Sequence, residues 1–173
     1  MRKLALSDEI LLSVDKAARY IGGEVNSVMK DKNKVDIRFA MCFPDVYEIG
    51  MSNLGMMILY NMFNEREDVW AERVFSPWLD LDKIMREKEI PLFALESQEP
   101  VKNFDFLGIT LGYEMCYTNV LQVLDLSHVS LLAKDREEDD PIVIGGGACA
   151  YNPEPIAEFF GLPSFVSTHL VMA

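Results

Sequence analysis

The sequence predicts a three-layer α/β domain with a mostly parallel sheet of four to five strands. Half of its 173 residues are hydrophobic, which is enough to form a sizeable core in a single domain. From residue 35 onward, short apolar runs alternate with helical patterns. This alternation is typical of a parallel sheet that helices cover on both faces.

The first 34 residues form a segment ahead of that alternation. Residues 7–20 predict a helix, because Ser7 is a good cap and apolar residues recur on one face. Gly22 and Gly23 end this helix, and a charged turn follows at residues 30–34. We interpret residues 1–34 as an N-terminal extension before the core.

The alternating elements begin with a strand and a buried helix. The helix at residues 53–64 is apolar nearly all round, which indicates burial. A second helix, at residues 79–90, carries its acids early and its bases late, as the helix dipole favours. Further helices are expected at residues 115–126 and after Asn152, with Pro153 in the first helical position. Strands are predicted at residues 35–43, 69–75, 91–95, 104–112, 130–133 and 141–147.

The charge balance disfavours a nucleic-acid partner. Acidic residues outnumber basic residues 28 to 16, for a net charge of -12, so a phosphate backbone would be repelled. No apolar run approaches the roughly 18 residues of a membrane helix, and we expect no contact with a membrane. Asp8 and Glu9 interrupt the apolar start of the chain, so we expect no signal peptide.

The cysteines argue against a metal centre on this chain. Cys42, Cys116 and Cys149 lie far apart and form no CxxC pair, so neither a zinc site nor an iron–sulfur cluster is complete. An odd count at wide spacing suits the reducing cytoplasm. We therefore predict a cytoplasmic protein in which the three thiols are small core or loop residues.

The candidate site is formed by the loops that follow the strands. Ligands of such sheets bind beyond the carboxyl ends of the strands, where the strand order reverses. The loops at residues 44–52, 110–114 and 145–152 contain neither Lys nor Arg. No P-loop lysine follows the glycines at 145–147, and no GxGxxG follows the first strand. A large, nearly neutral ligand suits these loops better than a triphosphate, unless the glycines serve only a tight turn.

The first of these loops carries a motif. Its residues DVYEIG, 45–50, have the spacing Asp-x-Tyr-x-x-Gly. This spacing resembles Asp-x-His-x-x-Gly, the signature of cobalamin-binding domains, with Asp45, Tyr47 and Gly50 at the three motif positions. In that family the histidine ligates cobalt from below, and a phenol with a pKa of about 10 is a poor substitute for imidazole.

The second and third loops extend the resemblance. FDFLGITLGYE resembles the second loop of the cobalamin-binding fold, and PIVIGGGACAYNPEPIAEFF resembles the third. With KAARYIGGEVNSV and NEREDVWAERVFSPW, they resemble the N-terminal cobalamin-binding-like domain of one uncharacterised bacterial family of radical S-adenosylmethionine proteins. The cofactor contacts that this resemblance implies in the two loops are Thr110, Leu111, Gly112, Gly145, Gly146 and Gly147.

The resemblance covers about residues 16–160 and implies a flavodoxin-like (Rossmann-like) domain at residues 35–160. It also implies cobalamin bound without a histidine lower ligand, with Tyr47 packed under the corrin ring. Family members continue into a radical module, whose CxxxCxxC motif holds an iron–sulfur cluster used with S-adenosylmethionine. That module, in cis or in trans, is the expected partner. This chain alone is expected to have no catalytic residues and no radical activity.

Residues 161–173 depart from the family, which continues with a further strand and an acidic Gly-Asp-Gly-Glu-like segment. We interpret them as an atypical tail, and our hypothesis for its origin is a shortened chain or a shifted reading frame. The edge of the sheet would then be incomplete. Self-association through that edge is therefore a further expectation.

Two other functions fit the same sequence. Tyr47 in the histidine position suits a domain that has lost its cofactor and serves as a structural or protein-docking module. A flavin- or nucleotide-binding protein is disfavoured by the lack of bases and of a hydroxyl-rich first loop. An open cleft above the glycine loops favours a cofactor, whereas a cleft filled by Tyr47, Tyr113 and Tyr151 favours docking.

Overall fold

The computed structural model describes residues 4–160 and 165–166, so most of the tail predicted at residues 161–173 lies outside the described residues. The strands are β1 (Ile37–Phe43), β2 (Val69–Phe75), β3 (Phe106–Thr110), β4 (Ile142–Gly146) and β5 (Phe165–Val166). They form one parallel sheet in the order β2-β1-β3-β4-β5. This is the flavodoxin-like order, which reverses between β1 and β3, and it confirms the predicted α/β class.

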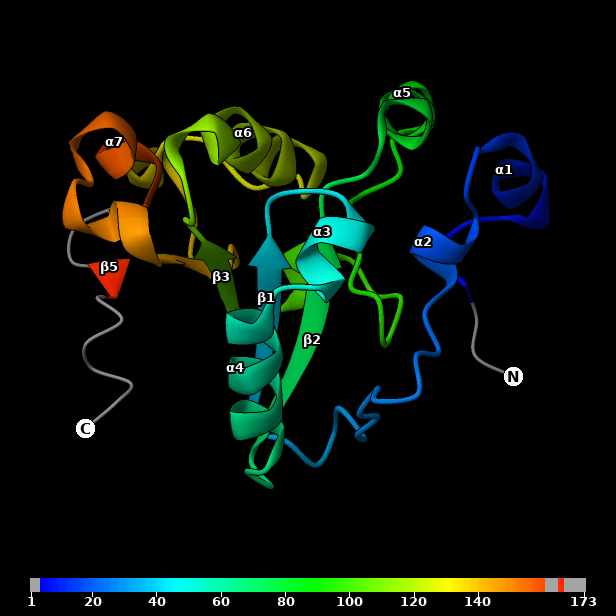
Figure 1. Ribbon diagram of the computed structural model, residues 1–173, viewed down its shortest axis with the longest axis horizontal. Coiled ribbons are helices and arrows are strands. Elements are labelled where there is room, and N and C mark those ends of the chain that lie inside the picture. The colour runs from blue at the N-terminus through cyan, green and yellow to red at the C-terminus, as the bar shows by residue number, and fades with distance from the viewer. Residues whose placement is uncertain (1–3, 161–164, 167–173) are drawn as a thin grey trace.

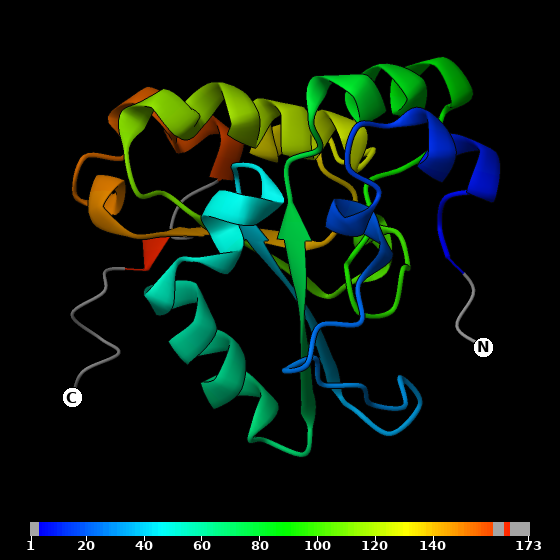
Figure 2. The same ribbon diagram turned by 45° about the vertical axis from the view of Figure 1, so that its right-hand side comes forward.

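Helices cover both faces of the sheet. α5 (Leu79–Lys88), α6 (Tyr117–Leu126) and α7 (Ala157–Phe160) lie on one face, and α4 (Leu54–Asn64) lies on the other (Figure 1). α1 (Asp8–Ser13) and α2 (Ala18–Ile21) precede the sheet, and α3 (Tyr47–Met51) connects β1 to α4. A view turned by 45° shows the same two layers of helices (Figure 2). None of the helices in the described ranges combines the length and apolar composition that a membrane crossing requires.

Short 3-10 turns join several of these elements, and two of them follow strands at the candidate site. They are η1 (Val101–Asn103), η2 (Glu114–Cys116), η3 (Ala133–Asp135), η4 (Ala148–Tyr151) and η5 (Glu154–Ile156). Because η2 follows β3 and η4 follows β4, the second and third predicted loops are tightly wound. The backbone of these two loops therefore stays next to the carboxyl edge of the sheet.

Two apolar cores hold the layers together. The larger core lies between the sheet and the helices α5 and α6, and Leu107 and Val120 belong to it. The smaller core lies under α4, where Met56 and Tyr60 pack with Met41 of β1. The alternation of side chains along each strand sends neighbouring residues into different cores.

The α4 face of the sheet is only partly covered. On β4, Ile142 is 56% exposed and Ile144 is half-buried, whereas Val143 on the opposite face is 2% exposed. Parallel sheets usually bury both faces. The part of β3 and β4 that α4 does not reach is therefore an open apolar surface.

Residues 91–95 are not the predicted strand. The backbone N–H of Leu95 donates to the carbonyl of Arg73 at 2.8 Å, and Phe93 forms an isolated bridge with Pro100. Glu96 then points its carboxylate at the backbone of β2, where it accepts from the Arg73 N–H at 2.7 Å. The segment thus covers the edge of β2 without a regular ladder.

Three other predicted elements need correction. Residues 130–133 contain no strand and lead into η3. The helix predicted at residues 7–20 is divided into α1 and α2, because the backbone at Val14 is extended. Pro153, and not Asn152, occupies the cap position of η5.

A fully buried ion pair lies at the β2 edge. Arg73 Nε and Glu96 Oε1 are 2.6 Å apart, and neither side chain is exposed. The guanidinium also donates to Asn26 Oδ1 at 3.2 Å and to Ser27 Oγ at 3.0 Å, and it lies 4.5 Å from the ring centroid of Tyr60. Burial raises the pKa of Glu96, and the charge of Arg73 opposes that rise.

The N-terminal segment packs onto β2 and α4. The Lys30 ammonium donates to the carbonyls of Asn64 at 3.0 Å and Val69 at 2.6 Å, which satisfies an open carbonyl at the end of α4. Trp70 Nε1 donates to the Val28 carbonyl at 2.9 Å. Residues 1–34, where described, therefore cover the edge strand of the sheet.

Replacing Glu96 by Ala is expected to lower the free energy of unfolding by about 3–5 kcal/mol, because Arg73 would be left as a buried charge without its carboxylate. Denaturation by urea, followed by circular dichroism, measures the change. The control is Glu87→Ala, which breaks an exposed pair with Lys83 and is expected to cost less than about 0.5 kcal/mol. Equal losses in the two variants would contradict the importance of the buried pair.

Candidate functional site

An apolar groove runs along the open part of the sheet beside α4. β3 and β4 form its floor, to which Thr110 and Ile144 contribute, and α4 forms its wall with Met56 and Leu59. The groove has a volume of about 250 Å³, and none of the described residues that line it is charged. It lies next to the carboxyl ends of β3 and β4, where parallel sheets bind their ligands.

Aromatic rings form part of the groove wall. Phe39 stacks on Phe63 with ring centroids 4.9 Å apart, and both line the groove. Phe39 also stacks on Phe106, outside the groove lining, with centroids 5.9 Å apart. A Cβ at Gly108 would lie 2.6 Å from the Phe39 ring, so the glycine lets this ring lie flat over β3. Flat apolar walls of this kind suit an aromatic or aliphatic group.

The glycine run at the end of β4 brings the second and third predicted loops into close contact. Gly147 has a φ of 121°, and a Cβ there would lie 2.6 Å from the carbonyl oxygen of Leu111. The Leu111 N–H donates to the Gly146 carbonyl at 2.6 Å, and its own carbonyl accepts from Cys149 at 3.0 Å. The glycines therefore serve a tight approach of two loops, and they also line the groove.

Asp45 and Tyr113 meet across the point where the strand order reverses. Asp45 follows β1, Tyr113 follows β3, and the Tyr113 hydroxyl donates to Asp45 Oδ2 at 2.5 Å. Asp45 Oδ1 accepts from Val46 at 2.7 Å, and Asn119 holds the same loop by donating to the Pro44 carbonyl at 2.9 Å. The hydrogen bond to Asp45 and partial burial raise the pKa of Tyr113 to about 12.

Tyr47 and Gly50, the other two motif residues, lie away from the groove. The Tyr47 hydroxyl donates to Glu24 Oε1 at 3.1 Å, and its ring meets Phe75 edge-on with centroids 5.6 Å apart. Burial is the main cause that raises the pKa of Tyr47. A Cβ at Gly50 would lie 2.3 Å from the Phe75 ring. The spacing of these two residues therefore serves packing against β2.

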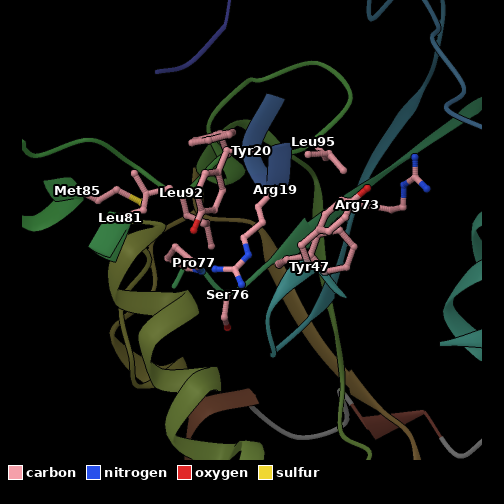
Figure 3. A pocket seen from close by; sticks show the side chains of 12 residues that line it. Arg19, Tyr20, Tyr47, Arg73, Ser76, Pro77, Leu81, Met85, Leu92 and Leu95 are labelled. Atoms are coloured by element: carbon pink, nitrogen blue, oxygen red, sulfur yellow. The ribbon is translucent and has the colours of Figure 1, made fainter. Parts of the chain in front are cut away.

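Figure 3 shows the small interior pocket that Tyr47 lines together with Arg19, Tyr20 and Arg73. Its volume is about 20 Å³, which is room for about one water molecule. The pocket is therefore too small for an organic cofactor. The ring of Tyr47 lies against Phe75 at the end of β2 and does not line the groove over β3 and β4.

The nine predicted cofactor contacts thus fall into separate groups. Thr110 and the glycines at 145–147 line the groove together. Leu111 is fully buried in the larger core, and Gly112 is exposed, with no atom within 4 Å of the position of a Cβ. Of the three tyrosines expected to fill a cleft, none lines the groove.

The described part of the chain contains no group of three or more His, Cys, Asp or Glu side chains placed to hold a metal ion. Cys42, Cys116 and Cys149 are free and buried, as expected for small core residues. Burial raises the pKa of the Cys42 thiol, so it is a poor nucleophile.

The comparison with protein families identifies the class of the chain. The model of the family described as "Radical SAM proteins, N-terminal" matches residues 55–165, which is more than half of the chain. The chain belongs to this family. The match includes β2, β3, β4 and the first residue of β5, together with every strand residue of the groove except those of β1. It begins after the motif at residues 45–50.

One relative is an uncharacterized protein of Methanocaldococcus jannaschii. It is 28% identical over 124 residues, which cover 70% of this chain and 22% of the relative. The chain therefore spans about a fifth of the length of that relative. No solved structure matches the chain.

Sequence reasoning missed two features of the site. The first is the aromatic wall formed by Phe39 and Phe63. Both residues are visible in the sequence, but periodicity alone does not show that their rings stack. The second is the bond between Asp45 and Tyr113, whose partners are 68 residues apart. No local pattern predicts that contact.

Two glycines of the predicted site are expected to behave differently when mutated. Gly50→Ala should lower the free energy of unfolding by about 1–3 kcal/mol, because its methyl group would overlap the Phe75 ring. The matched control, Gly112→Ala, should change it by no more than about 0.5 kcal/mol. Thermal and urea denaturation measure both variants. A stable Gly50→Ala protein would contradict the packing role of that glycine.

Proposed function

We propose that the chain is an accessory domain of a radical S-adenosylmethionine protein and that it binds cobalamin. Membership of the N-terminal family supports the first part. The observation that supports the second part is the uncharged groove at Thr110 and the glycines of residues 145–147. It lies where the ligands of parallel sheets bind.

The residues of the groove fit part of a cobalamin molecule. Cobalamin is large and carries little charge for its size, so a site without Lys or Arg suits it. The groove is slightly smaller than the roughly 300–1,000 Å³ of typical small-molecule sites. It would accept one aromatic or aliphatic substituent, and the corrin ring would lie outside it, over the carboxyl edge. The bound cofactor would supply cobalt chemistry, while the protein binds and orients it.

Tyr47 does not replace the histidine lower ligand in this proposal. Its hydroxyl is bonded to Glu24 and its ring packs on Phe75, so both parts of the side chain are already engaged. The proposed cofactor is therefore bound without imidazole ligation. This differs from the expectation that Tyr47 packs under the corrin ring.

The proposal includes a partner and a location. A radical module, in cis or in trans, would supply the iron–sulfur cluster and bind S-adenosylmethionine, and the greater length of the archaeal relative supports a further module. The protein would work in the cytoplasm.

Self-association through the edge of the sheet at β5 is a separate proposal, which sedimentation of the purified chain tests.

A docking domain without a cofactor is the second candidate function. The observation in its favour is the hydrogen bond between Asp45 and Tyr113, which joins two loops across the reversal point of the sheet. A ligand placed there must lie above that bond or displace it. A corrin ring at the carboxyl edge would lie above the bond, and the bond leaves the groove beside α4 open for a substituent. The open groove favours the cofactor.

The first test is a titration of the folded protein with hydroxocobalamin, followed by desalting and an absorption spectrum. Retained corrin with a spectrum that lacks imidazole ligation is the expected result. Ile144→Tyr, which fills the groove, is expected to weaken binding by at least about tenfold. Folded wild-type protein that retains no corrin would favour the docking function.

The matched control is Ile142→Tyr. This residue lies on the same strand and the same face as Ile144, two positions earlier, and it does not line the groove. It is expected to bind hydroxocobalamin like the wild type. Equal weakening in the two variants would place the corrin elsewhere on the sheet.

A further inference from the structure

The structure raises the question of which side chain meets the ring of the proposed cofactor. Tyr47, the residue in the motif position, is turned toward β2 by Glu24 and Phe75. The corrin ring of the proposed site would lie over the carboxyl edge, near the ends of β1, β3 and β4. Any residue that contacts it must come from the loops at that edge and must be exposed.

Tyr113 meets both conditions. It follows Leu111 and Gly112 at the end of β3, directly after the groove residue Thr110, and it is 41% exposed. Its hydroxyl is occupied by Asp45 at 2.5 Å. Because the polar end of the side chain is already bonded, the exposed remainder that a ligand meets is aromatic.

The acceptor of that bond is itself fixed. The carbonyl of Asp45 accepts from the Ser76 N–H at 3.0 Å, and its Oδ1 accepts from Val46 at 2.7 Å. Asn119 of α6 holds the preceding carbonyl of Pro44 at 2.9 Å. Ser76 and Asn119 therefore fix the backbone at Pro44 and Asp45, and the Val46 N–H fixes the carboxylate. The carboxylate in turn holds the Tyr113 hydroxyl at one place on the edge.

Other exposed apolar side chains stand on the elements that follow the same strands. Leu54 after β1, Met115 after β3 and Tyr151 after β4 are 72%, 86% and 66% exposed. Exposed apolar side chains that form a patch mark a binding surface, and these three lie on segments that follow the carboxyl ends of β1, β3 and β4. The three loops contain no Lys or Arg, so the surface suits a broad ligand with little negative charge.

We propose that Tyr113, anchored by Asp45, contacts the corrin ring at the carboxyl edge and takes the role that the motif assigns to Tyr47. The inference rests on the proposed cobalamin function and adds to it a named contact residue. In it Asp45 is a positioning residue, because it acts through the Tyr113 hydroxyl. Thr110 joins the two parts of the site, since it lines the groove three residues before Tyr113.

The test compares hydroxocobalamin binding by the wild type, Tyr113→Ala, Tyr113→Phe and Tyr47→Phe. Loss of the ring in Tyr113→Ala is expected to raise the dissociation constant by at least about tenfold. Tyr113→Phe keeps the ring and loses only its anchor, so a smaller rise of about threefold is expected. Tyr47→Phe removes the bond to Glu24 and is expected to bind like the wild type.

Two further readouts separate a ring contact from a structural role. The melting temperature of each variant shows whether the fold is intact, and Tyr113 is exposed enough for Tyr113→Ala to fold. The visible spectrum of the bound corrin should shift in Tyr113→Ala and not in Tyr47→Phe, because only the former changes the surroundings of the ring.

The outcomes are distinct. A wild type that binds no corrin overturns the proposed function and this inference with it. A wild type that binds corrin, with Tyr113→Ala unchanged in affinity and spectrum, overturns the role of Tyr113 and leaves the proposed function standing. Weaker binding in Tyr47→Phe alone would mean that Tyr47, and not Tyr113, contacts the corrin ring.

Discussion

The buried pair of Arg73 and Glu96 is the interaction on which the rest of the structure depends. A guanidinium without any exposure is costly unless its charge and its N–H groups are satisfied. Here the partners come from residues 24–27, from the segment after residue 91 and from the ring of Tyr60 on α4. These elements lie far apart in the sequence, and the pair can form only when all of them are in place.

This constraint divides the sheet into a closed side and an open side. Around β2, the N-terminal segment and residues 91–97 cover the edge strand, and Glu24 lies 3.6 Å from the Arg73 guanidinium. The same Glu24 accepts the hydroxyl of Tyr47, so the network that closes this side also draws the motif tyrosine into it. On the α4 face of β3 and β4 no comparable cover exists among the described residues, and the apolar groove lies there.

The same division explains how far the sequence predicts the molecule. Residues 35–43, 69–75 and 104–112 are apolar runs flanked by turns, and each contains the strand expected of it. Residues 91–95 are equally apolar, but the Leu95 N–H donates to the Arg73 carbonyl, and the Glu96 carboxylate accepts from the Arg73 N–H. No local pattern in the sequence reveals these contacts. The glycines at 145–147 were predicted to allow either a close ligand or a tight turn, and the structure places Gly147 against the Leu111 carbonyl of the neighbouring loop. The direction of Tyr47 was not predictable, because a buried arginine determines it.

The glycine contact also connects the two parts of the proposed site. Gly147 leaves no room for a side chain against the Leu111 carbonyl, so the loops after β3 and β4 are held at a fixed distance. Thr110 lies on one side of Leu111, in the groove, and Tyr113 lies two residues beyond it, at the edge. A ligand substituent in the groove and a ring over the edge would therefore both contact the backbone segment from Thr110 to Tyr113. Because this segment is already fixed before the ligand binds, binding would cost little conformational entropy of the loops.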